Sequence, residues 1–252
     1  DPLSSLHPYY RVGWQISEMI LAHERQTSKA AARIRAIDLL RLVGIPQPEQ
    51  RVDDFPHQFS GGMRQRAMIA MAMALNPILL IADEPTTALD VTVQAQVLQV
   101  MKRLQDEFGT AIILITHDLG VIAETADDVV VMYAGAAMEK ANRHDLFFEN
   151  HHPYTEGLLQ SLPAYGADRV RLRPISGQPP SLINLPRGCP FHPRCPYVMD
   201  RCRVDEPSLM EIEGRPGHTS ACWLPLNLTD RALRRATVEA EFAAAGKTGV
   251  AT

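Results

Sequence analysis

The sequence has no long hydrophobic run and no excess of basic residues. Its longest uninterrupted apolar stretch is Ala67 to Leu75, far below the roughly twenty residues that a membrane-spanning helix needs. The formal net charge is −4 at pH 7, whereas nucleic-acid-binding proteins usually carry a basic excess or a basic face. We therefore expect a soluble chain without a nucleic-acid partner. With 252 residues, of which 46% are hydrophobic, it can bury a substantial core.

Cysteine is missing from most of the chain, and all four cysteines lie in one short C-terminal segment. Nothing suggests secretion, so a metal site is favoured over disulfides. Five, six and nineteen residues separate successive cysteines, which is looser than the usual zinc-ribbon spacing and fits an iron–sulfur cluster at least as well. Zinc and four unrelated free thiols remain alternatives. The candidate ligands are Cys189, Cys195, Cys202 and Cys222, with His192 and His218 as possible substitutes and nearby arginines to offset cluster charge.

Short apolar runs alternate with helical stretches from residue 29 to residue 133. Runs of this length read as buried parallel strands, so the fold class is α/β with a parallel sheet. Thr27 or Ser28 can cap a helix that stops at Gly44, and a second helix follows the "SGG" and is closed by Asn76-Pro77. The first helix has its apolar stripe at Ile34, Ile37 and Leu40 to Val43, and the expected strands are 78–82, 111–116 and 129–133.

Titratable residues stand where two of the expected strands end. Asp83-Glu84 follows the first strand and His117-Asp118 follows the second. Ligands of open parallel sheets bind just beyond the carboxyl ends of the strands. A carboxylate there can hold Mg²⁺ against nucleotide phosphates, a second can polarise an attacking water, and a histidine can reach the terminal phosphate.

The "SGG" before the second helix predicts an anion site. Its glycines allow close backbone approach, and a helix N-terminus offers N–H groups and a positive dipole. Arg64 and Arg66 follow directly and strengthen this interpretation.

Three motifs in this order resemble ATP-binding cassette (ABC) ATPases. "FSGGMRQR" (59–66), "LLIADEPTTALD" (79–90) and "ILITHD" (113–118) are similar to the ABC signature, the Walker B strand with its D-loop, and the switch histidine. The resemblance implies ATP and Mg²⁺ as ligands, with a second ABC ATPase subunit that shares each site. The signature commonly ends in Gln, which offers an amide that Met63 lacks. The implied roles are Mg²⁺ binding by Asp83, catalysis by Glu84, γ-phosphate sensing by His117, contact with the opposite subunit by Asp90, and nucleotide binding by Ser60, Gly61, Gly62 and Met63.

A phosphate-cradling loop is absent from the sequence. In ABC ATPases each ATP lies between one subunit's phosphate loop and the other subunit's signature. We therefore expect the phosphate loop in a lobe upstream of Asp1, and expect the sequence to open partway through a longer polypeptide.

Two C-terminal stretches narrow the resemblance to one group of ABC ATPases. "HHPYTEGLLQSLP" (151–163) and "GCPFHPRCPYVMDRC" (188–202) resemble the extension of oligopeptide and dipeptide importer ATPases, whose cysteines can carry a 4Fe-4S cluster. This implies an ATPase at the cytoplasmic face of the membrane, with two transmembrane permease subunits and, indirectly, an extracytoplasmic substrate-binding protein. Residues 9–20 are a candidate permease contact. The implied domains are a helical subdomain (1–77), the C-terminal part of the ATPase core (78–150) and a loop-rich cysteine-containing extension (151–252).

Several alternatives stay open at this stage. The same extension occurs in importers of nickel and of glutathione. A soluble ABC ATPase that does not transport would need coiled-coil insertions or basic arms, which are not seen. A metal-binding interaction module with a degenerate ATPase half would gain ground if the native chain began at Asp1.

Overall fold

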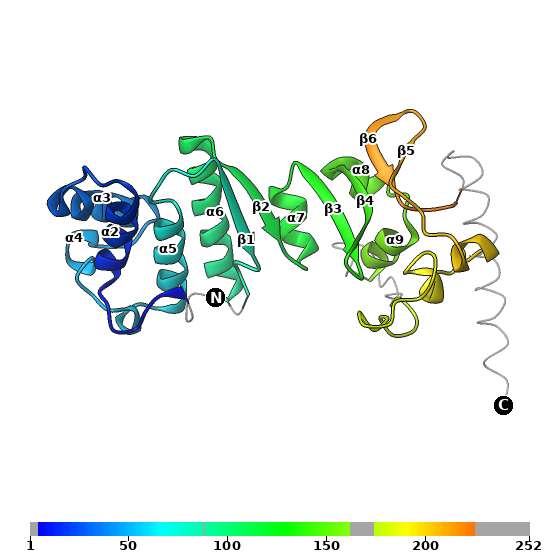
Figure 1. Ribbon diagram of the computed structural model, residues 1–252, viewed down its shortest axis with the longest axis horizontal. Coiled ribbons are helices and arrows are strands. Elements are labelled where there is room, and N and C mark those ends of the chain that lie inside the picture. Colours follow the sequence, from blue (N-terminus) through cyan, green and yellow to red (C-terminus); the bar gives the residue numbers. More distant parts are fainter. Residues whose placement is uncertain (1–4, 88, 162–173, 225–252) are drawn as a thin grey trace. The chain divides into compact units, whose positions relative to one another are not determined.

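The structure, a computed structural model, describes residues 5–87, 89–161 and 174–224 and forms two compact units, Asp1–Val121 and Ile122–Thr252 (Figure 1). The boundary between the two units lies earlier in the chain than the boundary expected near residue 150. Division of the chain by motif into 1–77, 78–150 and 151–252 stays a prediction. Among the described helices, none has the length and apolar character needed to cross a membrane.

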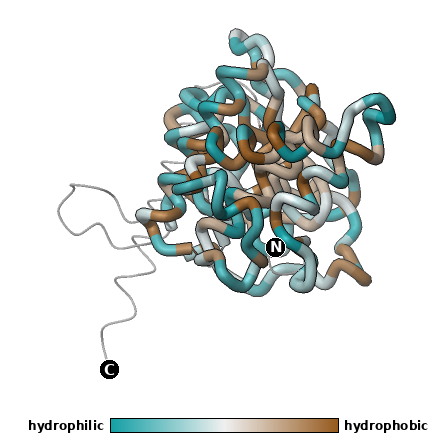
Figure 2. Tube along the Cα trace, turned by 90° about the vertical axis from the view of Figure 1, so that its left-hand side faces the viewer, coloured by the Kyte–Doolittle hydropathy of each residue, from teal (hydrophilic) through white to brown (hydrophobic). Residues whose placement is uncertain are grey.

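Helices dominate the first unit, and their apolar faces meet in one core. Figure 2 looks onto this end of the chain and shows hydrophobic and hydrophilic residues alternating along the helices. The elements are α2 (Val12–His23), α3 (Lys29–Leu42), α4 (Pro48–Arg51), η1 (Pro56–Gln58), α5 (Gly61–Ala72), β1 (Leu79–Asp83), α6 (Val91–Phe108) and β2 (Ala111–Ile115).

The predicted ends of α3 are confirmed. The Ser28 side chain accepts a hydrogen bond from the backbone N–H of Ala31, and Gly44 takes the left-handed conformation with φ 74°. Both features satisfy backbone groups that a helix end leaves unpaired. The predicted apolar stripe is only partly right, because Leu40 is fully buried whereas Ile34 is 62% exposed.

Strands β1 and β2 are parallel, as predicted, with Asp83 opposite Ile115. One face of this pair is partly buried among the described residues, as predicted, and the other face is exposed in this chain. Leu80, Ala82, Ile112 and Leu114 pack against the core, whereas their alternating neighbours Leu79, Ile81, Ile113 and Ile115 are exposed. The sequence of an all-apolar strand does not show that its two faces have different surroundings.

The third expected strand is not part of this parallel pair. Strand β3 (Asp128–Tyr133) pairs antiparallel with β4 (Ala136–Asn142) in the second unit. Ala134 and Gly135 lie between them with φ 51° and 83°, and two successive positive φ angles are what a tight two-residue hairpin requires. The expectation of a third strand in this parallel sheet is therefore wrong, because β3 pairs among the described strands with β4 and not with β1 or β2.

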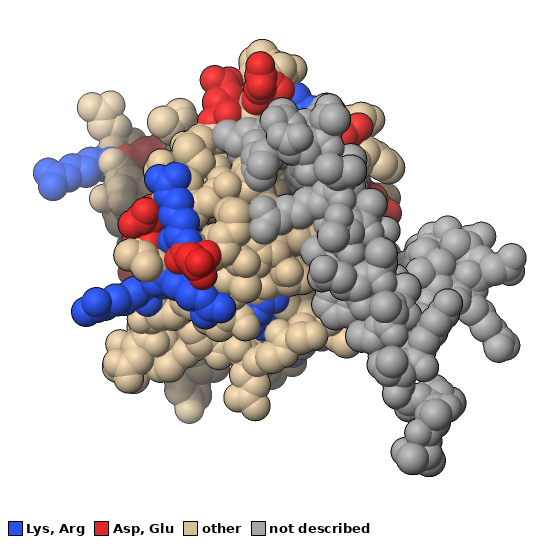
Figure 3. All heavy atoms as spheres, turned by 90° about the vertical axis from the view of Figure 1, so that its right-hand side faces the viewer, with Lys and Arg blue, Asp and Glu red and all other residues tan. Residues whose placement is uncertain are grey.

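The second sheet joins the expected ATPase segment to the cysteine segment. Its strand order is β3-β4-β6-β5, and both further pairings are antiparallel. Figure 3 looks onto this end and shows charged side chains toward the rim of the visible face, with uncharged residues across its middle. The remaining elements are α7 (Leu119–Thr125), α8 (Arg143–Phe148), α9 (Pro153–Gln160), η2 (His192–Arg194), η3 (Asp200–Arg203), β5 (Met210–Ile212) and β6 (Arg215–Ser220).

Candidate functional site

The parallel pairing of β1 and β2 brings two predicted catalytic residues together. Glu84 directly follows β1, and His117 lies two residues beyond β2. The distance between Nδ1 of His117 and Oε1 of Glu84 is 2.8 Å. The other predicted residue at this edge, Asp83, ends β1 and is exposed.

The backbone of Glu84 adopts an unusual conformation. Its φ is 49°, in the left-handed region that residues with a side chain seldom adopt. Its N–H continues the sheet by donating to the carbonyl of Ile115 at 2.9 Å. Strained conformations of this kind cost about 1–3 kcal/mol and are concentrated at functional sites. The turn therefore aims the Glu84 side chain away from the strand direction and toward His117.

Both carboxylate oxygens of Glu84 are engaged. The hydroxyl of Thr87 donates to Oε2, while His117 contacts Oε1. The hydrogen bond from Thr87 and then the contact with His117 hold the pKa of Glu84 below its ordinary value. Glu84 in turn raises the pKa of His117, so the pair favours a carboxylate facing an imidazolium. Each carboxylate oxygen keeps a further lone pair beside these contacts, so Glu84 can still accept a proton from water.

The predicted signature residues begin helix α5. The Ser60 hydroxyl accepts a hydrogen bond from the backbone N–H of Met63 at 3.3 Å, so Ser60 caps the helix. Gly62 is required by packing, because a Cβ at this position would lie 2.4 Å from Cγ1 of Val93. Gly61 is exposed and lacks such a constraint, since a Cβ there would find only Leu89 at 4.0 Å.

Two neighbours of this motif have structural partners. Met63 packs against the core of the first unit, which accounts for an apolar residue here. Arg66 was expected to support anion binding, but its guanidinium donates to the carbonyl of Gly44 and to Oε1 of Gln96, both at 3.1 Å. Arg66 therefore connects α5 to its surroundings, and its support of anion binding stays a prediction.

Asp90 caps helix α6. Its Oδ1 accepts a hydrogen bond from the backbone N–H of Val93 at 2.9 Å. The side chain is exposed, and its predicted contact with a partner subunit stays a prediction.

The four cysteines line one cavity of the second unit, about 10 Å³ in volume, together with His152, His192 and Trp223 among others. The backbone N–H of Cys189 donates to the carbonyl of Cys202 at 2.9 Å. Burial raises the pKa of Cys195 to about 12 and also raises the pKa of Cys189, which favours the thiol over the thiolate form of both. As the side chains stand, the described residues hold no group of three or more His, Cys, Asp or Glu arranged as a metal site.

The two substitute ligands behave differently. His192 lines the cavity, with Nδ1 2.9 Å from the carbonyl oxygen of Cys189. His218 directs Nε2 to Oε1 of Glu139 at 2.8 Å and is committed to that contact. Arg194, expected to offset cluster charge, donates to the carbonyls of Ser176 and Ile175.

Known proteins resemble both the N-terminal and the C-terminal part of this chain. The ABC transporter family matches residues 6–87, and the family described as "Oligopeptide/dipeptide transporter, C-terminal region" matches residues 138–202. The dipeptide transport ATP-binding protein DppD of Escherichia coli is 50% identical over 227 residues, which cover 90% of this chain and 68% of that protein. The chain belongs to the ATP-binding proteins of oligopeptide and dipeptide ABC transporters.

Two further comparisons show how much of a relative's length this chain covers. The oligopeptide transport ATP-binding protein OppD of Mycobacterium tuberculosis is 51% identical over 99% of this chain, which spans 41% of that protein's length. The structure of cbiO1 from Clostridium perfringens, part of the ABC transporter complex cbiONQ, has 30% identity and a TM-score of 0.52. The alignment covers 59% of this chain and 57% of the cbiO1 chain, so the ABC fold is shared over that part.

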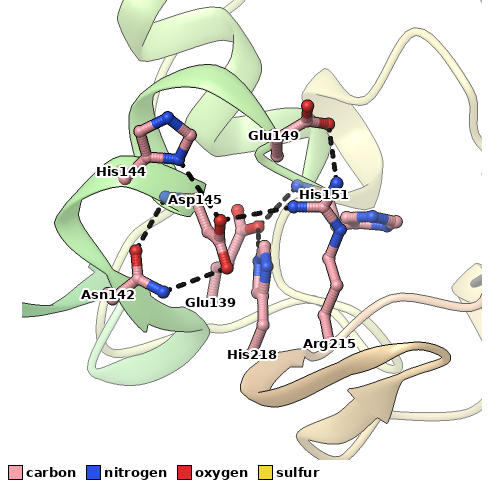
Figure 4. A network of polar contacts seen from close by, with 8 residues as sticks. All are labelled: Glu139, Asn142, His144, Asp145, Glu149, His151, Arg215 and His218. Carbon is pink, nitrogen blue, oxygen red and sulfur yellow. Dashed lines mark hydrogen bonds and ion pairs between the residues drawn. The ribbon is translucent and has the colours of Figure 1, made fainter.

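Sequence reasoning missed a buried polar network in this ABC protein (Figure 4). Glu139 on β4 is fully buried and accepts hydrogen bonds from the backbone N–H groups of His151 and His152 as well as contacting His218 on β6. Burial alone would raise the pKa of Glu139, but the bonds from His218, from Thr155 and from the two backbone groups hold it below its ordinary value. A glutamate between Met138 and Lys140 gives no sequence signal of burial.

Two side chains near Glu84 were also missed. Thr87 was seen only as part of a motif, although its hydroxyl binds the Glu84 carboxylate. Gln94 was seen only as a helical residue, although Nε2 donates to Oδ2 of Asp118 at 3.0 Å. The contact of Gln94 depends on the tertiary structure, whereas that of Thr87 is formed within the turn that follows β1.

Proposed function

We propose that the complete protein hydrolyses ATP and thereby powers the import of dipeptides or oligopeptides through an ABC permease at the cytoplasmic face of the membrane. The observation that carries this proposal is the contact between Glu84 and His117 at the carboxyl ends of two parallel strands. The names of relatives at about 50% identity favour peptides over nickel or glutathione as the transported molecule. An ABC ATPase unconnected to transport is correspondingly less well supported.

In the proposed reaction each residue at the strand ends has a separate task. Asp83 offers the exposed carboxylate oxygens that Mg²⁺ prefers, and the ion would neutralise charge on the nucleotide phosphates. Glu84 would orient and deprotonate the attacking water through the lone pairs that Thr87 and His117 leave free. His117 would then present a donor to the terminal phosphate.

The segment Ser60-Gly61-Gly62 would bind the ATP that a second ABC subunit holds on its phosphate loop. The start of α5 is capped by Ser60, and Gly61 leaves the backbone open on its exposed side. A helix N-terminus of this kind attracts phosphate through its N–H groups and its dipole. Asp90, also exposed at a helix start, would contact the same partner subunit.

Replacing Gly61 with aspartate tests this shared site. The Gly61→Asp variant places a negative side chain where phosphate is expected, so ATP-dependent association should weaken at least about tenfold through charge repulsion. Light scattering of the full-length protein with Mg-ATP measures the association. Its melting temperature should stay within about 2 °C of the unmodified protein, because the side chain enters open space. Normal association of a correctly folded variant would contradict the shared-site proposal.

Residues 9–20 would contact the permease, which consists of two transmembrane subunits fed by an extracytoplasmic substrate-binding protein. Tyr10 and Trp14 stack with ring centroids 4.4 Å apart, and Tyr9 beside them is 82% exposed. Exposed aromatic side chains that lie together are typical of protein interfaces.

The four cysteines would hold a structural 4Fe-4S cluster, with one zinc ion as the weaker alternative. Their joint lining of one cavity supports a shared ligand, and thiolates are the donors that either metal species requires. Because burial favours the thiol form of Cys189 and Cys195, metal binding to these cysteines would release protons. In this small segment the cluster would contribute local order.

Single cysteine replacements test the cluster. Protein purified without oxygen should be brown and contain about four irons per chain. Cys195→Ser or Cys202→Ser should bleach it and make residues 174–224 at least about tenfold more sensitive to protease, because metal binding contributes folding free energy. The strand ends with Glu84 and His117 should be unaffected. A colourless protein with one zinc would contradict the cluster, and a metal-free protease-resistant segment would contradict both metal proposals.

A further inference from the structure

The first turn of helix α6 lies between the signature segment and the loop that carries His117. On one side Val93 approaches Gly62 so closely that a Cβ on Gly62 would lie 2.4 Å from Cγ1 of Val93. On the other side the next residue, Gln94, donates from Nε2 to Oδ2 of Asp118 at 3.0 Å. Two consecutive residues therefore connect α5 and the loop after β2 through one rigid helix.

Asp118 is held in place on both of its carboxylate oxygens. While Oδ2 accepts from Gln94, Oδ1 accepts from the backbone N–H groups of Gly120 at 2.9 Å and Val121 at 3.3 Å. Its own N–H donates to the hydroxyl of Thr116 at 3.0 Å. The hydrogen bond from Gln94 contributes most to keeping the pKa of Asp118 below its ordinary value, so the side chain stays an ionised acceptor. Asp118 thus fixes the backbone immediately next to His117.

The His117 side chain itself has little support. It is 81% exposed, and its contact with Glu84 is the one described ion pair that connects it to the end of β1. This exposed contact is weak and can open in water. The hydrogen bond between Gln94 and Asp118 is then the side-chain bridge that still ties this loop to α6.

We propose that Gln94 is a positioning residue for ATP hydrolysis, which holds the His117 loop through Asp118 and couples it to the signature segment through its neighbour Val93. The inference deepens the proposed function and rests on it. Gln94 does not touch the reacting atoms, and its amide acts by restricting where His117 can lie when Glu84 is released.

Steady-state ATP hydrolysis by the full-length protein, assembled with its partner subunits, tests the role. Gln94→Ala should lower kcat about tenfold, the value of one hydrogen bond to a charged group, with less than a twofold change in KM for ATP. Gln94→Lys restores a donor of similar reach and should recover at least half of the lost kcat. Gln99→Ala is the matched control, because Gln99 lies on the same helix and is exposed, and it should leave kcat unchanged. Thermal melting confirms that each variant is folded.

Two further measurements separate positioning from a general loss of structure. In a His117→Ala background the Gln94→Ala change should have no additional effect on kcat, because the residue it positions is gone. The ring resonance of His117, observed by NMR with labelled histidine, should shift in Gln94→Ala and stay unmoved in Gln99→Ala. Unmodified protein that fails to hydrolyse ATP would overturn the proposed function, and the NMR comparison would then decide only whether Gln94 positions His117. The inference about Gln94 would be overturned by any one of four results. These are an unchanged kcat, no rescue by lysine, additivity with His117→Ala and an unmoved His117 resonance.

Discussion

The Glu84→Gln variant of the assembled protein should bind Mg-ATP with nearly unchanged affinity while its turnover falls at least about a hundredfold. Glutamine keeps the shape of the side chain and can still accept from Thr87 through its amide oxygen. It cannot accept a proton from water, because the amide is not basic. Equilibrium binding of a fluorescent ATP analogue and phosphate release, measured on the same preparation, give the two quantities.

The control is Glu107→Gln on helix α6, an exposed glutamate that makes the same chemical change away from the strand ends. It should leave both binding and turnover unchanged. Asp83→Asn should instead weaken Mg²⁺-dependent nucleotide binding. If Glu84→Gln hydrolysed ATP at the rate of the unmodified protein, Glu84 would not be the catalytic carboxylate.

The Glu139→Gln variant should destabilise the second unit by about 2–4 kcal/mol, the range for disrupting a buried, hydrogen-bonded charge. Glu139 faces donors on every side that the structure describes, namely the backbone N–H groups of His151 and His152 and Nε2 of His218. An amide turns its NH₂ group toward one of these donors. Hydrogen exchange at the amides of β4 and β6, followed by mass spectrometry, measures the free energy of local opening.

Acid should reduce the stabilisation that Glu139 contributes. The folded-state pKa of Glu139 is depressed, so its stabilisation is fully present above the unfolded value of about 4.3 and is lost as the pH falls through the folded pKa. The difference between the unmodified protein and Glu139→Gln should therefore shrink below about pH 4. Glu213→Gln, in the exposed hairpin turn, is the control and should change stability by less than about 0.5 kcal/mol. An equally small effect of Glu139→Gln would contradict a stabilising role for the buried network.

Local features of the fold were predictable because their causes are local. Ser28 and Gly44 mark the ends of α3, and the "SGG" marks the start of α5, through capping interactions within a few residues of the sequence. The meeting of Glu84 with His117 was also predictable, because parallel strands place their carboxyl ends at one edge of a sheet.

Features that depend on distant partners were not predictable. One missed feature was local, because the run at β3 has the same apolar character in either type of sheet and the turn at Ala134 and Gly135 pairs it with β4. Burial of Glu139 depends on β6, which lies far along the sequence. The motif "SGGMRQR" does not reveal that Arg66 is engaged by Gly44 and Gln96.

ATP-driven uptake of a labelled tripeptide into proteoliposomes tests the proposed function most directly. The vesicles would contain the full-length protein with its permease and enclosed Mg-ATP, with peptide and substrate-binding protein outside. We predict that peptide accumulates with enclosed ATP, that enclosed ADP gives none, and that Glu84→Gln abolishes accumulation although ATP is still bound. Accumulation without ATP, undiminished uptake by Glu84→Gln, or ATP hydrolysis that never accompanies uptake would contradict the proposed role in peptide import.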